Sequence, residues 1–237
     1  SLKIKIFNRE ICASALPDTN SLCAKSSAEM EEKMGIQEFL SNGDERLDRR
    51  FLFTAEIDRM TSVLRRTLLL DKSRRENDAE HSWHIAVMAM LFSEYATEPV
   101  DIGRVVQMCV VHDLVEIYAG DTFAYDIEGN ADKEAREKEA ADKLFAMLPG
   151  EQGQMIRGMW EEFDAMETAD AKYAACMDRL QPFFHNTLTD GHTWVESGTN
   201  HTAVEKRMAV IKEFMPRVYD WVAANIDHAI GAGWLKL

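Results

Sequence analysis

Apolar residues recur along most of the chain at spacings of three, four and seven residues, the pattern of amphipathic helices packed against a core. In the segment from about Asp78 to Tyr95, this apolar stripe includes His81. The pattern predicts helices from about 27 to a break at 42–44, from there through 70, and over 78–95, 101–120, 131–148, from about 168 onward, and from about 201 past 221. Because no sustained strand pattern accompanies them, the sequence predicts an all-α fold.

The two ends of the chain differ in character. Residues 1–27 combine a short alternating run with a polar stretch and lack a long helical period, so we expect an N-terminal extension there. Residues 28–237 show no internal repeat and are predicted to form a single helical domain, with a core over about 45–190 followed by a C-terminal helix. The stretch 186–200 is rich in Asp, Gly, Ser and Asn and is predicted to be a loop.

Composition narrows the possible partners. The chain has 237 residues, 46% of them hydrophobic, and a formal net charge of −14, whereas binding to a nucleic-acid polymer depends on clustered Lys and Arg. No segment approaches the roughly 20 apolar residues that cross a bilayer. The four cysteines show no CxxC spacing, which favours reduced thiols and a cytoplasmic location. We therefore expect a small-molecule partner, with no nucleic acid and no membrane.

His112-Asp113 is the most informative polar feature. Four apolar or small residues precede the pair and Leu-Val follows it, so both side chains are expected where water is scarce. An ionised carboxylate buried without a partner costs several kcal/mol or more. The pair therefore requires a cation, a metal ion or a dense set of hydrogen bonds.

Two other predicted helices carry metal-ligating groups on inward faces, His81 on one and Asp178 on an alanine-rich face of the other. Taken alone, His81 could be a hydrogen-bonded core histidine, and Asp178 could pair with a cation. Together with His112-Asp113 they offer two imidazoles and two carboxylates, which suit a divalent first-row ion. Four protein ligands on an octahedral ion leave positions for water and substrate, so the set predicts a catalytic metal site between helices.

The order His, His-Asp and a distant Asp resembles the HD-domain superfamily of metal-dependent phosphohydrolases, which are helical bundles. Over roughly residues 45–185 the chain is similar to the HD-domain 5′-deoxynucleotidases, and it resembles still more closely a bacterial branch of HD hydrolases. The residues that carry the resemblance are Arg66, Glu76-Asn77, Glu80-His81-Ser82, His112-Asp113-x-x-Glu116 and Gly120-Asp121, with Arg-Arg-Glu-Asn-Asp-Ala-Glu-His-Ser and Asp-Thr-Phe-Ala-Tyr-Asp for the bacterial branch.

The resemblance implies roles for individual residues. It implies metal ligation by His81, His112, Asp113 and Asp178. It further implies acid/base and water-positioning roles for Glu116 and Asp121, and contact of Arg66 with the phosphate. The metal would be manganese, cobalt, magnesium or another first-row ion, and a second ion could bind at Glu116 and Asp121, with Thr122 joining them. A homodimer is also expected. The less specific alternatives are a helix-end salt bridge for the two acids and an ordinary surface cation for Arg66.

The predicted function is release of phosphate from a (deoxy)nucleoside 5′-monophosphate. In the deoxynucleotidases a tryptophan closely follows the arginine, whereas Thr67-Leu68-Leu69 follows Arg66 here, so discrimination against a 2′-hydroxyl is not predicted. One alternative substrate is another small phosphate ester or a guanosine polyphosphate, although Ile117 replaces the second acid expected for the latter. A different class of function is a non-catalytic, metal-binding helical interaction protein.

Overall fold

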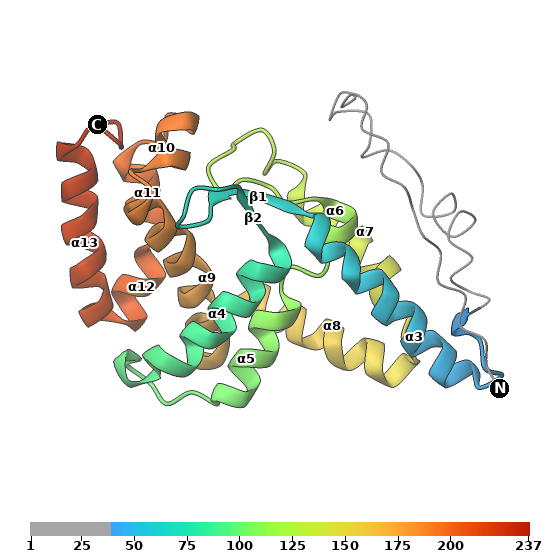
Figure 1. The fold of residues 1–237 in the computed structure, drawn as a ribbon. Helices are drawn as coiled ribbons and strands as arrows, with labels where there is room; N and C mark the ends of the chain where they lie inside the picture. The colour runs from blue at the N-terminus through green and yellow to red at the C-terminus, as the bar shows by residue number, and fades with distance from the viewer. Residues whose placement is uncertain (1–38) are drawn as a thin grey trace, which may run out of the picture. The chain divides into compact units, whose positions relative to one another are not determined.

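The structure is a computed structural model that describes residues 39–237, so the predicted extension over 1–27 and the first predicted helix lie outside the described residues. Within them, Asn42–Leu237 form one compact unit built almost entirely of helices. At its centre α4, α5 and α9 pack against one another (Figure 1). The elements are α3 (Glu45–Ile57), η1 (Asp58–Ser62), β1 (Leu64–Leu68), β2 (Arg75–Asn77), α4 (Asp78–Phe92), η2 (Ser93–Tyr95), α5 (Ile102–Val111), α6 (Glu116–Ala119), α7 (Lys133–Phe145), α8 (Gly150–Ala165), α9 (Ala169–Leu188), α10 (His192–Ser197), α11 (His201–Arg207), α12 (Ala209–Phe214) and α13 (Pro216–Gly231).

Local caps fix where the central helices begin. The Asn77 side chain accepts a hydrogen bond from the Glu80 backbone amide, and the Glu80 carboxylate accepts one from the Asn77 backbone amide. This capping box starts α4 at Asp78, three residues before His81. Thr168 caps α9 by accepting from the Ala171 amide. Small alanines on the buried face of α9 then allow close approach to α4 and α5, as the sequence predicted.

The predicted helix over 101–120 is interrupted, which corrects that prediction. Helix α5 ends at Val111, residues 112–115 form turns, and α6 starts at Glu116. The ring Nδ1 of His112 lies 2.9 Å from the carbonyl oxygen of Cys109, and the Glu116 amide donates to the Asp113 carbonyl, a tighter spacing than in an α-helix. Val105, Met108 and Cys109 of α5 belong to one hydrophobic cluster, whereas Val111 packs against a second cluster that contains Leu114, Val115 and Ile117, so His112-Asp113 lies between two apolar regions.

The predicted helix from the break at 42–44 through residue 70 is correct for α3, which ends at Ile57, and wrong beyond η1. After α3 and η1 the chain forms β1 and β2, an antiparallel hairpin. Along β1 the more buried positions are Arg65 and Thr67, whereas Leu64 and Arg66 are exposed. Polar side chains on the inward face removed the alternation of apolar and polar residues by which a strand is recognised. The fold is thus all-α, as predicted, apart from this hairpin.

The C-terminal predictions need two further corrections. The predicted loop over 186–200 contains the last turn of α9 and the short helix α10, and the predicted long helix after residue 201 is three helices. Met215 is not helical, and Pro216, which has no backbone N–H, begins α13. Helix α8 had not been recognised in the sequence. None of the helices within residues 39–237 is long and apolar enough to cross a membrane.

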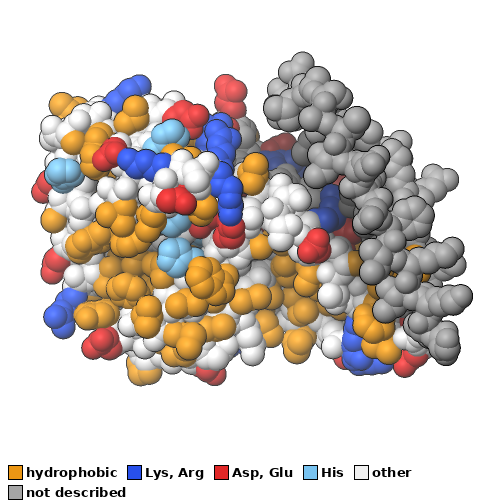
Figure 2. Space-filling view, in the orientation of Figure 1, with side chains coloured by type: hydrophobic (Ala, Val, Ile, Leu, Met, Phe, Trp, Pro, Cys, Tyr) orange, Lys and Arg blue, Asp and Glu red, His pale blue; other side chains and the backbone are white. Residues whose placement is uncertain are grey.

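Helix α4 carries an exposed apolar stripe as well as its buried face. Trp83, Met90 and Leu91 are each more than 60% exposed, and Val87 lies between them. Figure 2 shows hydrophobic side chains gathered over the part of this face where α4 lies. This helix is therefore apolar on two sides, the buried face predicted from the sequence and a second face that is exposed.

Candidate functional site

The residues predicted to bind a metal come together from α4, the turn after α5, and α9. The Nε2 atom of His81 lies 3.2 Å from Oδ1 of Asp178, and Nε2 of His112 lies 3.7 Å from the same oxygen. Asp113 completes the group, with Oδ1 3.1 Å from Nε2 of His112 and Oδ2 3.9 Å from Nε2 of His81. The two imidazoles are buried, and ligand atoms of the two histidines and Asp178 lie close enough to share one ion.

The electrostatics of this group suit a cation. Burial opposes a charge on His112, but the carboxylates of Asp113 and Asp178 together outweigh it and raise the pKa of His112 to about 10. Burial and the charge of Arg65 lower the pKa of His81 to about 4. Burial alone would raise the pKa of Asp178, yet its contacts with the two histidines hold that pKa well below its ordinary value. The Nε2 atom of His112 is buried and makes no hydrogen bond, so the donor set fits a divalent metal ion.

His81 is oriented by a buried amide. Its Nδ1 donates to Oε1 of Gln181 at 3.0 Å, which leaves the Nε2 lone pair directed towards Asp178. The other end of the amide, Nε2 of Gln181, lies 2.6 Å from Oε1 of Glu76, 3.2 Å from Nδ1 of His84 and 3.1 Å from Nε2 of His185. Gln181 therefore connects the metal group to a second polar cluster.

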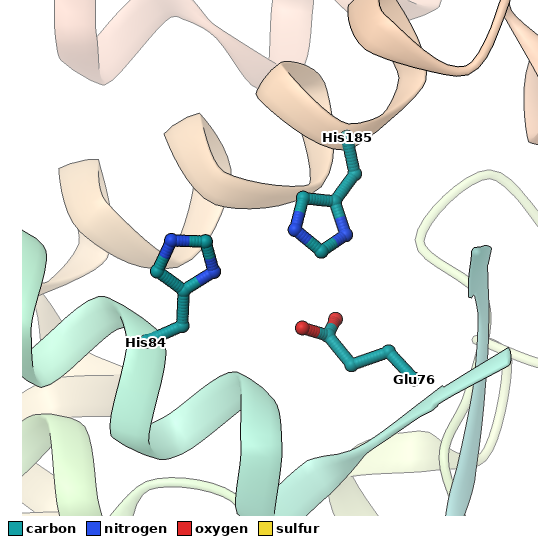
Figure 3. Close-up of side chains that lie close together, drawn as sticks. All are labelled: Glu76, His84 and His185. Atoms are coloured by element: carbon teal, nitrogen blue, oxygen red, sulfur yellow. The ribbon is translucent and has the colours of Figure 1, made fainter. Parts of the chain in front are cut away.

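That second cluster consists of Glu76, His84 and His185, which point towards one another from β2, α4 and α9 (Figure 3). Their ligand atoms are close enough to hold a metal ion. Burial lowers the pKa of both histidines, that of His185 to about 4, so each ring can accept a hydrogen bond at neutral pH. The Gln181 amide nitrogen lies within hydrogen-bond distance of all three residues, and its two hydrogens can be donated to two of them.

A second carboxylate group lies beside the metal ligands. It contains the two predicted catalytic acids, Glu116 and Asp121, together with Asp78, and their oxygens are close enough to share an ion. Burial, reinforced by the Asp113 charge, raises the pKa of Asp78 to about 7 and that of Glu116 well above its ordinary value. Burial also raises the pKa of Asp121. Carboxyl groups in such surroundings can keep and transfer a proton near neutral pH.

Arg65 is the cation that faces these acids. Its guanidinium NH1 lies 2.8 Å from Oδ2 of Asp113 and 3.4 Å from Oδ1 of Asp78, and its Nε lies 3.9 Å from Glu76. Arg66, the arginine expected to contact phosphate, is exposed and does not line the same cavity; its guanidinium lies over the Phe123 ring at 5.0 Å. Sequence reasoning missed Arg65 and Asp78, although Asp78 is three residues before His81 and hence on the same side of α4.

Glu116, Asp121 and His112 line a cavity of about 230 Å³, together with Asp113 and Asp178. Its other walls include aromatic side chains such as Phe123, Trp160 and Phe163, and four cations, Arg65, Lys133, Arg179 and Arg207. Arg207 also lies 3.3 Å from Oδ2 of Asp178. The cavity thus offers candidate metal ligands, proton-holding acids, cations and flat apolar surfaces to one small ligand.

The segment after α6 forms one wall of this cavity and is anchored from α7. Gly120, at φ +76°, ends α6. Arg136 then donates to the carbonyl oxygens of Ala119 at 2.7 Å and Gly129 at 2.9 Å, and to the Thr122 hydroxyl at 3.1 Å. A single guanidinium therefore holds both ends of the segment that carries Asp121.

Comparisons with known proteins point to one family. Residues 57–219 match the HD domain. The human 5′-deoxynucleotidase HDDC2 is 29% identical over 108 residues, 46% of this chain and 52% of that protein. The Xenopus laevis 5′-deoxynucleotidase HDDC2 is 26% identical over 149 residues, 61% of this chain and 73% of that protein. The match with the human protein thus spans about half of its length.

A solved structure shows the same fold at higher identity. It is the crystal structure of a protein described as a predicted metal-dependent phosphohydrolase from Magnetospirillum magnetotacticum MS-1, with 47% identity and a TM-score of 0.78, covering 84% of this chain and all of the other. The predicted family and the predicted helical fold are confirmed by these matches. Because the family match covers well over half of the sequence, this chain belongs to the HD domain family.

Proposed function

We propose that this chain is a metal-dependent phosphohydrolase that releases phosphate from (deoxy)nucleoside 5′-monophosphates. The observation that carries the proposal is the meeting of His81, His112 and Asp178 at one point beside Glu116, an acid whose pKa is raised well above its ordinary value by burial. Relatives named as 5′-deoxynucleotidases, and one described as a predicted metal-dependent phosphohydrolase, support the same reaction and substrate class.

The proposed ligands of the metal ion are His81, His112, Asp113 and Asp178, and the ion would be manganese, cobalt, magnesium or another first-row ion. A divalent ion supplies a Lewis acid for the phosphoryl oxygens and lowers the pKa of water. Glu116 and Asp121, close to Asp78, are the proposed place of a second ion, with Thr122 beside them on the cavity wall. The oxygen-only character of this second set suits a hard cation.

The chain's own residues supply proton transfer and charge. Glu116 and Asp121 are the proposed acid and base, because burial raises the pKa of each. Arg66 remains a proposed phosphate contact at the cavity rim, since Phe123, over which its guanidinium lies, lines the cavity.

A phosphate-release screen tests this proposal. Metal-depleted protein is supplied in turn with manganese, cobalt and magnesium and assayed on deoxy- and ribonucleoside 5′-monophosphates. We expect release with at least one ion and at least a hundredfold loss in Glu116→Gln, with helical content unchanged. Glu139→Gln, at an exposed position on α7, is the matched control and should keep full activity.

Other outcomes would redirect the assignment. Release only from guanosine polyphosphates or another small ester would replace the substrate class and keep the reaction. An inert protein that still binds metal would favour the non-catalytic interaction protein instead. Full activity in Glu116→Gln would contradict the role proposed for this acid.

A homodimer is part of the proposal, and the exposed apolar stripe on α4 supports it. Trp83 is 67% exposed and Met90 63% exposed. Exposure of this apolar surface to water costs free energy, and a second copy of the chain would remove that cost by covering the stripe. Analytical ultracentrifugation of the whole chain tests this, with Met90→Lys expected to shift the dimer towards monomer. We also keep the cytoplasmic location as a proposal, which the two buried free thiols of Cys109 and Cys176 support.

A further inference from the structure

Two arginines lie side by side at the metal cavity. Arg179 follows the proposed metal ligand Asp178 on α9, Arg207 is the last residue of α11, and both line the cavity. Arg179 is partly buried, and its guanidinium lies close enough to Arg207 to interact with it electrostatically. Neighbouring guanidinium groups repel one another, so this arrangement costs free energy unless an anion lies between or beside them.

The two arginines have little acidic compensation. Arg207 makes one ion pair, with Asp178. Within residues 39–237, Arg179 makes no ion pair, and its side-chain contact is with the Met166 sulfur at 3.1 Å. This is unexpected in a chain with 41 acidic and 27 basic residues, where an acid is normally available for each cation. A metal ion bound by Asp178 would also engage the single carboxylate that Arg207 has.

A second cavity, of about 620 Å³, begins where the arginines lie. It shares Arg179, Arg207 and Tyr125 with the metal cavity and extends along the Ser197–Asn200 turn to Lys206. Lys206 is exposed and makes no ion pair among the described residues. None of the four proposed metal ligands lines this second cavity. Arg179 and Arg207 line both cavities, whereas Lys206 and one acid, Asp126, line the second cavity alone.

We infer that Arg179, Arg207 and Lys206 bind a second phosphate group of the substrate, one that is not released. The inference rests on the proposed function and narrows its substrate class to nucleotides with two separate phosphates, such as nucleoside 3′,5′-bisphosphates. A phosphate offers several acceptor oxygens and up to two negative charges, which match two planar guanidinium groups and an ammonium group better than one carboxylate would. The continuity of the two cavities allows one molecule to occupy both.

The test compares two substrates with the whole chain after metal reconstitution. For the wild type we expect kcat/KM to be at least tenfold higher for adenosine 3′,5′-bisphosphate than for adenosine 5′-monophosphate, the effect of about one charged hydrogen bond or more. Arg179→Gln and Lys206→Gln should each lower this ratio, the former by tenfold or more. Lys138→Gln, an exposed lysine on α7, is the control and should leave the ratio unchanged.

A wild-type ratio near one would overturn the inference, and so would an Arg179→Gln variant that keeps the wild-type ratio. If no ester releases phosphate, the proposed function fails, and calorimetric titration with adenosine 3′,5′-bisphosphate still decides the second site. Binding that Arg179→Gln weakens at least tenfold and Lys138→Gln does not weaken would support the site, whereas absent binding or equal binding in the two variants would overturn it.

Discussion

Gln181→Leu isolates the effect of the amide that orients His81. The substitution keeps an uncharged side chain but removes the acceptor of His81 Nδ1 and the donor to Glu76, at 3.0 and 2.6 Å. Each buried polar group left without a partner costs about 1–3 kcal/mol, so the free energy of unfolding should fall by about 2–5 kcal/mol. Loss of the group that fixes a histidine ligand typically weakens metal binding by about 10- to 100-fold.

Cobalt titration followed by visible absorption and calorimetry measures the affinity, and urea unfolding measures the stability. The matched control is Asn186→Leu, which removes another buried amide of α9, one that donates to the Pro182 carbonyl and accepts from the Thr193 amide. It should lose stability without losing the cobalt affinity. The reasoning is refuted if Gln181→Leu binds cobalt as tightly as the wild type, or if both variants lose affinity equally.

Further substitutions test the electrostatics and the packing. Arg65→Leu leaves buried carboxylates without their cation and should lower the free energy of unfolding in chelator by about 3–5 kcal/mol. Added manganese should restore part of this loss. Urea unfolding curves that show a loss below about 1 kcal/mol would argue against this role of Arg65. Burial raises the pKa of Glu76 to about 7, so between about pH 4 and pH 8 the folded state holds a proton that the unfolded state has lost. In chelator, the free energy of unfolding of the wild type should therefore fall by about 3 kcal/mol relative to that of Glu76→Gln over this pH range. A difference in unfolding free energy that stays constant with pH would contradict the raised pKa. In α8, Gly153→Ala should destabilise the fold by about 1–3 kcal/mol because its Cβ would lie 2.4 Å from the Phe145 carbonyl oxygen. Gly158→Ala has open space around it and should stabilise the fold by about 0.5–1 kcal/mol. Thermal unfolding that ranks the two variants in the opposite order would refute the packing argument.

The central helices and the metal group were predictable because their signal is local. Helical spacing placed His81 on an inward face, and a polar pair within an apolar run marked His112 as buried; the structure has both rings at most 5% exposed. The small residues around Asp178 indicated an inward-facing position, but its assignment as a ligand depended on the family resemblance. In each case the residue's burial is encoded within one helical turn of its own sequence.

The hairpin and the supporting residues were not predictable in this way. Arg65 and Thr67 occupy the inward face of β1, where a hydrophobic pattern has nothing to detect. Gln181 acts through contacts with residues about a hundred positions away in the sequence, and a neutral amide carries no signal of such a role. The pairing of Arg179 with Arg207 likewise depends on how α9 and α11 meet, which neither segment specifies alone.

The Arg136 anchor has a consequence for how this site can diversify. Because it ties the segment after α6 at Ala119, Thr122 and Gly129, substitutions between Thr122 and Gly129 change a cavity wall whose ends stay fixed. Phe123 and Tyr125 lie in that interval and line the cavity, whereas the metal ligands lie outside it. Over evolutionary time, ligand preference can therefore drift through these positions under weak constraint while the chemistry of the HD group is inherited intact.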